Sequence, residues 1–361
     1  MRRSLRWRAR EICTASTPST RRPTQAQASR NLQEELKPHD AVRQEGADEW
    51  NSLLSRASVD STELSGKTAR DLQVFYTGLY RALTFPRRLD EPGDSGPVHW
   101  SPYRSGVQQG TLVTDNGFWD TFRTVYPLLA LLYPDALQWI CRGWLKAYEE
   151  GGWIPKWASP GYRNSMVGTY GDVVLAEAVV KGVLTGADAE KAWSALRRDA
   201  YEEAPPGGAV GKVGLRVYEQ HGYIPDDSGV SDCVSRTLDF AHADWATAQA
   251  ARLLNHPEDA EKLTRRAQQA VRQSFDAQTG LMRPKSRTGR FSMRFDETRW
   301  GDGYTEGSPW HHSFPPFDVE LLSRLHGSKE KLRDKILAMT RVPSTFDHGG
   351  HFPCLYQLVS P

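Results

Sequence analysis

Apolar residues recur at three- and four-residue spacing in a long succession of segments, and this pattern most restricts how the chain can fold. In one segment Val234, Leu238 and Ala241 step four and then three residues, so they lie on one face of a helix. The segments predicted as helices on this pattern are 45–59, 68–83, 118–134, 136–152, 172–186, 188–201, 234–248, 257–270, 318–328 and 330–343. Strand signals are few.

Long connections separate these predicted helices and hold most residues suited to binding or catalysis. They are 86–118, 151–170, 202–231, 276–310 and 341–361. Helix pairs joined alternately by short and long connections are typical of a toroid of helical hairpins, with the long connections gathered at one end. We therefore expect an all-α toroid, with a generic helical bundle as the alternative. Without an evident internal repeat, a solenoid is disfavoured.

The composition excludes several classes of protein. A net charge of +2 gives no strong attraction to nucleic acid or to a membrane surface. No apolar run approaches the ~20 residues that a membrane-spanning helix needs. The 4 cysteines are widely spaced, which disfavours a disulfide scaffold or a zinc site. We expect no nucleic-acid partner and no membrane span.

The first 34 residues differ from the rest, because they are rich in Arg, Ser and Thr and almost free of acidic residues. They lack the apolar stretch of a secretory signal. An organellar transit peptide, a disordered tail and a misassigned start codon all fit this composition, so the compartment stays open. We interpret 1–34 as a tail and 35–361 as the helical domain.

Glu306 is the sharpest candidate for chemistry, in the glycine-rich stretch GDGYTEGSPW. Breaking a glycosidic bond requires a carboxylic acid that protonates the departing oxygen. Pro309 and Trp310 would desolvate Glu306 and favour its protonated form. Alternatively Glu306 is an ordinary loop residue, and Thr305 and Ser308 serve to cap a helix.

The stretch TDNGFWDTFR is a second candidate site. Asp115 and Asn116 could cap the helix that follows, with Trp119 and Asp120 in its first turn. Asp120 could accept hydrogen bonds from two neighbouring sugar hydroxyls while Trp119 packs against the ring. The alternative is a well-started helix with no further role.

Three other charged residues stand in suggestive positions. Arg163, in the loop GGWIPKWASPGYRNSMVGT, could bind a hydroxyl or carboxylate, or pair with a structural acid. Asp244 lies in the middle of a helix and, if buried, needs a partner such as an arginine or a hydroxyl. Asp239 lies five residues before it, off that face, and we interpret it as structural.

Four histidines raise the question of a metal site. They are His311, His312, His348 and His351. The spacing of His348 and His351 would allow both to bind one metal ion, but no H-E-x-x-H motif or cysteine partner accompanies them. Transition-metal binding is therefore disfavoured. The chain also shows no P-loop, dinucleotide fingerprint or G-x-S-x-G elbow in context.

Six of these stretches together resemble glycoside hydrolase family 92, the calcium-dependent exo-acting α-mannosidases. In order they are FYTGLYRALTFP, TDNGFWDTFRTVYPLLALL, GGWIPKWASPGYRNSMVGT, SRTLDFAHADWATAQAARLL, GLMRPK and GYTEGSPW, within about residues 45–355. The resemblance implies an (α/α)6 toroid and inverting hydrolysis of terminal α-linked mannose, with calcium contacting the sugar hydroxyls. The calcium ligands are not identified by it.

The resemblance also implies roles for individual residues. Glu306, in Y-T-E-G, would be the general acid. Trp119 and Asp120 would line the terminal-sugar subsite, and His351 would be a further sugar contact. Arg163 and Trp310 join the expected sugar-binding set on their local surroundings. A mannose-containing glycan is thus the expected partner.

The departures from the family pattern matter as well. The resemblance places the catalytic base in a G-N-D-D segment downstream of the stretches matched here, and this chain contains no such segment. About ten predicted helices instead of twelve, and no preceding β-sandwich, lead us to expect a truncated domain with an incomplete toroid and self-association through its open edge. WHHSFPPFD replaces a more aromatic stretch, and DHGG replaces G-N-E-P.

Two alternatives to the mannosidase remain. One is a catalytically inactive glycan-binding or scaffold protein that lacks the general base. The other is a different (α/α)6 glycosidase, similar to trehalase or glucoamylase, which would keep the fold and change the sugar.

Overall fold

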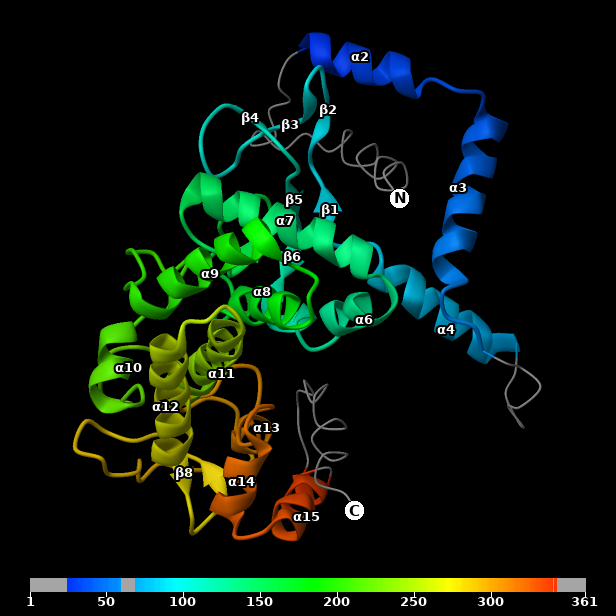
Figure 1. Cartoon of the computed structure of the whole chain (residues 1–361). Helices are drawn as coiled ribbons and strands as arrows, with labels where there is room; N and C mark the ends of the chain where they lie inside the picture. The colour runs from blue at the N-terminus through cyan, green and yellow to red at the C-terminus, as the bar shows by residue number, and fades with distance from the viewer. Residues whose placement is uncertain (1–24, 60–68, 340, 343–361) are drawn as a thin grey trace. The chain divides into compact units, whose positions relative to one another are not determined.

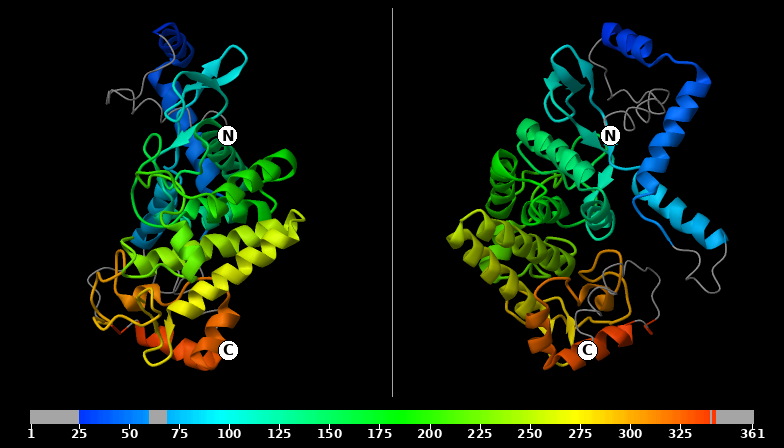
Figure 2. Two further views of the ribbon diagram at one scale, coloured as in Figure 1. Left: turned by 90° about the vertical axis from the view of Figure 1, so that its left-hand side faces the viewer. Right: turned by 45° about the vertical axis from the view of Figure 1, so that its right-hand side comes forward.

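A computed structural model describes residues 25–59, 69–339 and 341–342 of the chain. The chain forms two compact units. The first unit takes in the described residues up to Asn116, together with Pro127–Gly152 and Ala158–Tyr162. The second takes in Gly117–Tyr126, Trp153–Trp157 and the described residues from Arg163 onward. Figures 1 and 2 colour the chain by residue number, from blue at the N-terminus to red at the C-terminus.

The first unit combines helices with small antiparallel strand pairs. Its helices are α2 (Gln25–Glu35), α3 (His39–Leu54), α4 (Ala69–Ala82), most of α6 (Val125–Leu132) and α7 (Pro134–Gly151). Its strands are β1 (Arg87–Arg88), β2 (Glu91–Gly93), β3 (Gly96–Trp100), β4 (Val107–Gln109) and β5 (Val113–Thr114). β1 pairs with β5, and β2, β3 and β4 form one sheet with Val98 opposite both Glu91 and Gln109. The Pro- and Gly-rich connection 86–118 is therefore folded into short hairpins.

The second unit holds the longest helix among the described residues. Its helices are α5 (Phe118–Thr121), α8 (Tyr170–Val180), α9 (Gly186–Tyr201), α10 (Leu215–His221), α11 (Cys233–Leu253), α12 (Pro257–Ser274), α13 (Pro309–His312), α14 (Val319–His326) and α15 (Lys329–Met339). β8 (Phe275–Asp276) pairs with β9 (Leu281–Met282). In β6 (Asn116–Gly117) and β7 (Trp157–Ala158) the chain passes from one unit to the other.

Helix α11 is the centre of the second unit. Helices α8, α9 and α12 all pack against it, and α12 lies alongside it in both figures. Its buried residues fall on every side of the helix and include Ser235, Asp239, His242 and Asp244 beside the apolar ones. The apolar spacing predicted one buried stripe; the structure surrounds the helix, because many of its residues are alanines that allow close approach.

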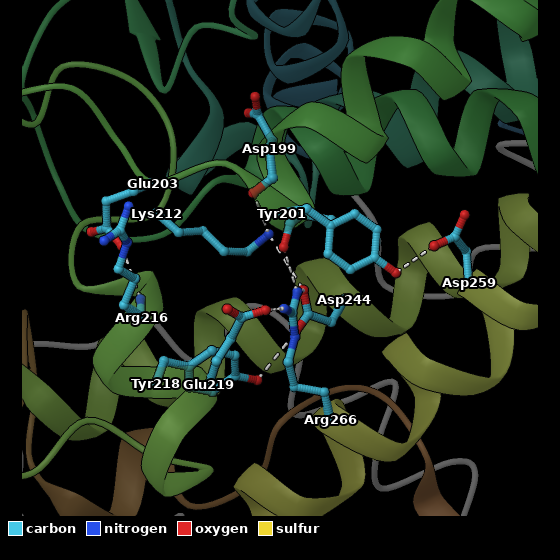
Figure 3. Close-up of polar contacts among 11 residues, drawn as sticks. Asp199, Tyr201, Glu203, Lys212, Arg216, Tyr218, Glu219, Asp244, Asp259 and Arg266 are labelled. Carbon is cyan, nitrogen blue, oxygen red and sulfur yellow. Dashed lines mark hydrogen bonds and ion pairs between the residues drawn. The ribbon is translucent and has the colours of Figure 1, made fainter.

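A buried group of charges ties α11 to its neighbours (Figure 3). The Asp244 carboxylate accepts two hydrogen bonds from Arg266 of α12, at 2.6 and 2.7 Å. Tyr218 of α10 donates a third at 3.2 Å, and Lys212 Nζ lies 3.4 Å from Asp244 Oδ1. The prediction that a buried Asp244 needs an arginine or hydroxyl partner is confirmed.

Two further carboxyl groups complete this buried group. Lys212 Nζ lies 3.6 Å from Asp172 Oδ2 and donates to the Asp199 backbone carbonyl at 3.1 Å. Burial, followed by the charge of Asp172, raises the pKa of Asp199 well above its usual range. Burial also raises the pKa of Asp172, against the lowering charge of Lys212. A raised pKa favours the protonated form of a carboxyl group, and this form reduces the repulsion between two neighbouring carboxylates.

The predicted helical character of the chain is confirmed, and each of the ten predicted segments overlaps a helix or helices of the structure. Within the described ranges, three helices are additional: α2, α10 and α13. α2 begins within the segment predicted to be a tail. In the described part of the chain, no helix combines the length and apolar character that crossing a membrane requires.

Candidate active site

A cavity in the second unit gathers side chains from α5, α8, α11 and the segment around α13. Its lining residues are Trp119, Arg123, Tyr170, Leu238, Asp239, His242, Glu306, His311, His312, Phe314, Pro315 and Pro316. The set mixes aromatic rings, prolines, two carboxyl groups and three imidazoles. Such a cavity offers both apolar surface and directional hydrogen-bonding groups.

The loop that carries Glu306 is anchored to the start of α11. The backbone carbonyl of Gly303 accepts from the N–H groups of Val234 and Ser235, at 3.0 and 3.2 Å. The backbone N–H of Thr305 donates to Ser235 Oγ at 2.9 Å. The bonds to Gly303 satisfy the first N–H groups of α11, which have no partner within the helix. The bond from Thr305 fixes the residue immediately before Glu306.

Glu306 itself has an unusual backbone. Its φ is +58°, in the left-handed region that residues with a Cβ rarely adopt. This conformation costs roughly 1–3 kcal/mol and persists where the surroundings impose it, often at functional sites. Glu306 is half-buried.

A short helix fixes the residues after Glu306. Ser308 precedes α13 and is paired with His311 in a reciprocal cap, with Ser308 Oγ and His311 Nδ1 3.0 Å apart. Pro309 opens the helix, as its fixed φ favours. Ser313 Oγ donates back to the Pro309 carbonyl at 2.6 Å. The turn thereby places His311 and His312 in the cavity wall.

Trp119 enters the cavity from α5. The guanidinium of Arg123 stacks over the Trp119 ring, 4.6 Å from its centre, and donates to the Trp119 carbonyl. The predicted capping of this helix by Asp115 or Asn116 is wrong. The residue before the helix is Gly117, no side chain caps it, and Asp115 instead forms an ion pair with Arg87.

Asp239 is the second carboxyl group of the cavity. The Tyr170 hydroxyl donates to its Oδ1 at 2.5 Å. Burial raises the pKa of Asp239 to about 6, against the lowering effects of the Tyr170 hydrogen bond and of the nearby cationic side chains. Its other oxygen, Oδ2, is shielded from solvent and has no hydrogen-bond partner among the described residues.

Two imidazoles of the cavity are neutral at ordinary pH. Burial lowers the pKa of His242 to about 3, and the charge of Arg123 lowers it further. Burial lowers the pKa of His312 to about 4. His242 stacks on Phe317, with ring centres 5.4 Å apart, which fixes the plane of its ring.

The residues predicted from sequence occupy different places. Trp119 and Glu306 line the cavity. Asp120 and Arg163 are exposed, and neither is among the lining residues. Trp310 is buried in the apolar core, with Lys335 Nζ 4.1 Å from the centre of its ring. His351 lies outside the described residues, and the roles of these residues stay predictions.

Sequence reasoning missed Asp239 and His242 as cavity residues. Both lie in the stretch TLDFAHADW, and their spacing of three residues puts them on one face of α11. That spacing was the available signal. The five-residue spacing of Asp239 and Asp244 gives no such signal, since those two carboxylates lie on different faces of a helix that is buried on all sides.

A calcium ion bound to this part of the chain would need a group of oxygen ligands there. Calcium takes six to eight oxygen ligands, usually including several carboxylates. Among the described residues, no group of three or more His, Cys, Asp or Glu side chains is placed to hold a metal ion.

Comparison with known proteins points to one family. Residues 27–351 match the glycosyl hydrolase family 92 catalytic domain. A family 92 inverting mannosidase from Bacteroides thetaiotaomicron is 33% identical, with a TM-score of 0.80 over 93% of this chain and 45% of its own. A family 92 α-mannosidase of the same species is 24% identical, with a TM-score of 0.73 over 87% of this chain and 41% of its own.

A curated relative comes from the fungus Arthroderma benhamiae and is named "Uncharacterized secreted glycosidase". It is 24% identical over 266 residues, which are 64% of this chain and 32% of the relative. The chain thus spans less than half the length of each of these three relatives.

Proposed function

The chain belongs to glycosyl hydrolase family 92, and on that basis we propose that it hydrolyses terminal α-linked mannose from glycans with inversion at the anomeric carbon. The cavity of the second unit is where the terminal sugar binds in this proposal. The helical hairpins would form part of an (α/α)6 toroid, as the family resemblance implies. The 33% identity to an inverting mannosidase supports the choice of sugar and of stereochemistry.

The observation that carries the proposal is the position of Glu306 in a cavity that Trp119 also lines. As the bond between the anomeric carbon and the leaving oxygen breaks, Glu306 donates its proton to that oxygen. The leaving group departs as a neutral alcohol, and Glu306 becomes a carboxylate. The strained backbone of Glu306 and its anchored loop hold the carboxyl group in place for this transfer.

The attacking water needs a base on the opposite face of the sugar. It adds to the anomeric carbon and gives up one proton, which restores the charge balance of the reaction. We assign no described residue to this role. In this proposal the base would come from a segment that follows the stretches matched here, as the family resemblance implies.

Calcium assistance is part of the proposal through the family resemblance alone. No group of three or more His, Cys, Asp or Glu side chains placed to hold a metal ion is found among the described residues, so no ligand and no step are assigned to the ion. The proposal expects that a chelator lowers activity and that added calcium restores it.

A substrate panel tests the proposed activity. The full chain is incubated with α-1,2-linked mannobiose and, separately, with matched α-glucosides, with and without chelator, and the released sugar is measured. We expect mannose from the α-mannoside only, and less of it with chelator. Release from α-glucosides alone would favour a trehalase- or glucoamylase-like enzyme. Unchanged release in chelator would remove calcium from the proposal.

A second candidate function is glycan binding without catalysis. It is favoured by the polar atoms of the cavity wall that have no partner among the described residues, because they suit a bound sugar whether or not it is cleaved. Binding of methyl α-D-mannopyranoside by a chain that releases no mannose would select this function over hydrolysis.

A further inference from the structure

Three side chains of the cavity each present a shielded polar atom without a hydrogen-bond partner among the described residues. These atoms are Asp239 Oδ2, His242 Nδ1 and His312 Nε2. Buried polar groups are almost always hydrogen-bonded, because losing water without a replacement is costly. Three such atoms around one cavity call for partners, which the hydroxyl groups of a ligand, or water in its absence, can supply.

The state of the three groups defines the chemistry of that ligand. The imidazoles of His242 and His312 are neutral near pH 7, since burial holds their pKa values at about 3 and about 4. A neutral imidazole has one donor and one acceptor nitrogen, whereas a carboxylate only accepts. These three groups therefore suit a ligand with several hydroxyl groups, which can both donate and accept hydrogen bonds.

The contact between Ser235 and His312 allows a tautomer in which His312 Nε2 carries the proton. Ser235 Oγ already accepts from the Thr305 N–H, and it lies 3.2 Å from His312 Nδ1. The hydroxyl proton of Ser235 can then be donated to Nδ1, which places the imidazole proton on Nε2. His312 Nε2 is in that arrangement a hydrogen-bond donor.

Asp239 is held in one orientation by its neighbours. The bond from the Tyr170 hydroxyl fixes Oδ1 at 2.5 Å. Gly168 lies against the other oxygen, since a Cβ built there would be 2.7 Å from Oδ2. An oriented carboxylate loses less entropy when it binds a ligand.

We propose that Asp239, His242 and His312 bind hydroxyl groups of the terminal sugar ring and set which sugar the cavity accepts. This inference rests on the proposed function and names the groups behind its specificity. Asp239 Oδ2 accepts from one hydroxyl, His312 Nε2 donates to another, and His242 Nδ1 takes a third contact. Trp119, Phe314 and the two prolines supply apolar surface for the C–H face of the ring.

The test measures binding of methyl α-D-mannopyranoside to the full chain by calorimetry or ligand-observed NMR. Asp239→Asn keeps the volume and one acceptor but removes the charge, and His312→Gln removes the ring. We expect each to weaken binding at least about tenfold, as loss of a charged or shielded hydrogen bond does. The matched control is His326→Gln, another shielded imidazole with an unpartnered Nε2 that is not among the lining residues.

The pH dependence of binding distinguishes a direct role of Asp239 from a structural one. Because the carboxylate form accepts the hydroxyl, affinity should fall as pH drops through about 6, where Asp239 gains a proton. Asp239→Asn should lose this step. The ionisable and charged groups around Asp239 are Tyr170 of α8, Arg236 and His242 of α11, Arg123 after α5 and Lys156 before α8, together with Glu306, His311 and His312, which line the same cavity.

The other groups around Asp239 either change charge at a pH well away from 6 or are distinguished from Asp239 by comparing the wild type with Asp239→Asn. His242 changes charge near pH 3, and burial lowers the pKa of Lys156 to about 8, so neither produces a step near pH 6. Glu306 and His311 are present in both proteins, so a step that survives in Asp239→Asn belongs to another group and counts against the proposal.

Two failures are distinguishable. If the wild type binds neither methyl α-D-mannopyranoside nor the α-glucopyranoside, the proposed function falls together with this inference. If the wild type binds the mannoside and both variants bind it equally well with the same pH profile, the inference alone is overturned.

Should Asp239→Asn fail to fold, Tyr170→Phe replaces it. Loss of that hydroxyl frees the carboxylate, so affinity should fall and the step in pH should move upward. Unchanged affinity with an unchanged step would contradict the role of Asp239.

Discussion

Asp239 and Asp244 show how the same residue type takes two roles on one helix. Asp244 is fully enclosed, and Arg266, Tyr218 and Lys212 occupy its oxygens. Asp239 has one oxygen held by Tyr170 and the other unpartnered among the described residues, at the wall of the cavity. Charge pairing makes the first a structural group. The unused acceptor makes the second available to a ligand.

Gly168 allows the close approach that positions Asp239. Its φ is +78°, and a Cβ there would lie 2.7 Å from Asp239 Oδ2 and 2.9 Å from Asp239 Cβ. We expect Gly168→Ala to lower the free energy of unfolding by the cost of a left-handed alanine, about 1–2 kcal/mol. The clash should add roughly 1–3 kcal/mol. Urea denaturation measures the total.

Gly182→Ala is the matched control for this substitution. Gly182 also has a left-handed φ, of +69°, but no atom lies within 4 Å of the Cβ it would gain. Its variant should show the backbone cost alone. Equal destabilisation by the two variants would show that Gly168 does not hold Asp239 in place by contact.

At the scale of elements, the packing of α11 against α12 depends on a buried ion pair. Arg266 donates two hydrogen bonds to Asp244 and one to the Ala200 carbonyl, and its Nη1 lies 2.6 Å from Glu219. Burial opposes the charge of Arg266, but Asp244 outweighs it and raises the pKa of the guanidinium. Removing one partner of such a pair leaves the other charge buried and uncompensated.

We therefore expect Arg266→Met to lower the free energy of unfolding by about 3–5 kcal/mol. The neighbouring Arg265 gives the control, because its ion pair with Glu261 is exposed on both sides. Arg265→Met should cost only about 0–1 kcal/mol. Chemical denaturation of both variants measures the two losses of unfolding free energy. Equal losses would contradict a stabilising role of the buried ion pair.

Sequence periodicity predicted the longer helices because each buries a stripe of apolar side chains. α12 illustrates this, since it begins at Pro257 and buries Ala260, Leu263 and Ala267 as their spacing requires. The short α10 and α13 carry too few turns to show a period. The strand pairs of 86–118 are two to five residues long, so alternation could not mark them either.

At the scale of the whole molecule, one cavity holds Glu306 and Trp119, two residues that the sequence analysis predicted for the site. Sequence motifs predicted two of its lining residues, Glu306 and Trp119, because both stand in recognisable stretches. They could not predict which side of a loop or helix turns inward. For that reason Asp120 and Arg163 were predicted for the site although both are exposed. Asp239 was not predicted for the site although it lines the cavity.

The most direct test of the central claim compares Glu306→Gln with the wild type on α-1,2-linked mannobiose. If Glu306 protonates the leaving oxygen, the variant should lose about 10²–10⁴-fold in the rate of mannose release while keeping its melting temperature. Glu320→Gln, at an exposed site on α14, should leave the rate unchanged. Mannose release by Glu306→Gln at the wild-type rate would contradict the account.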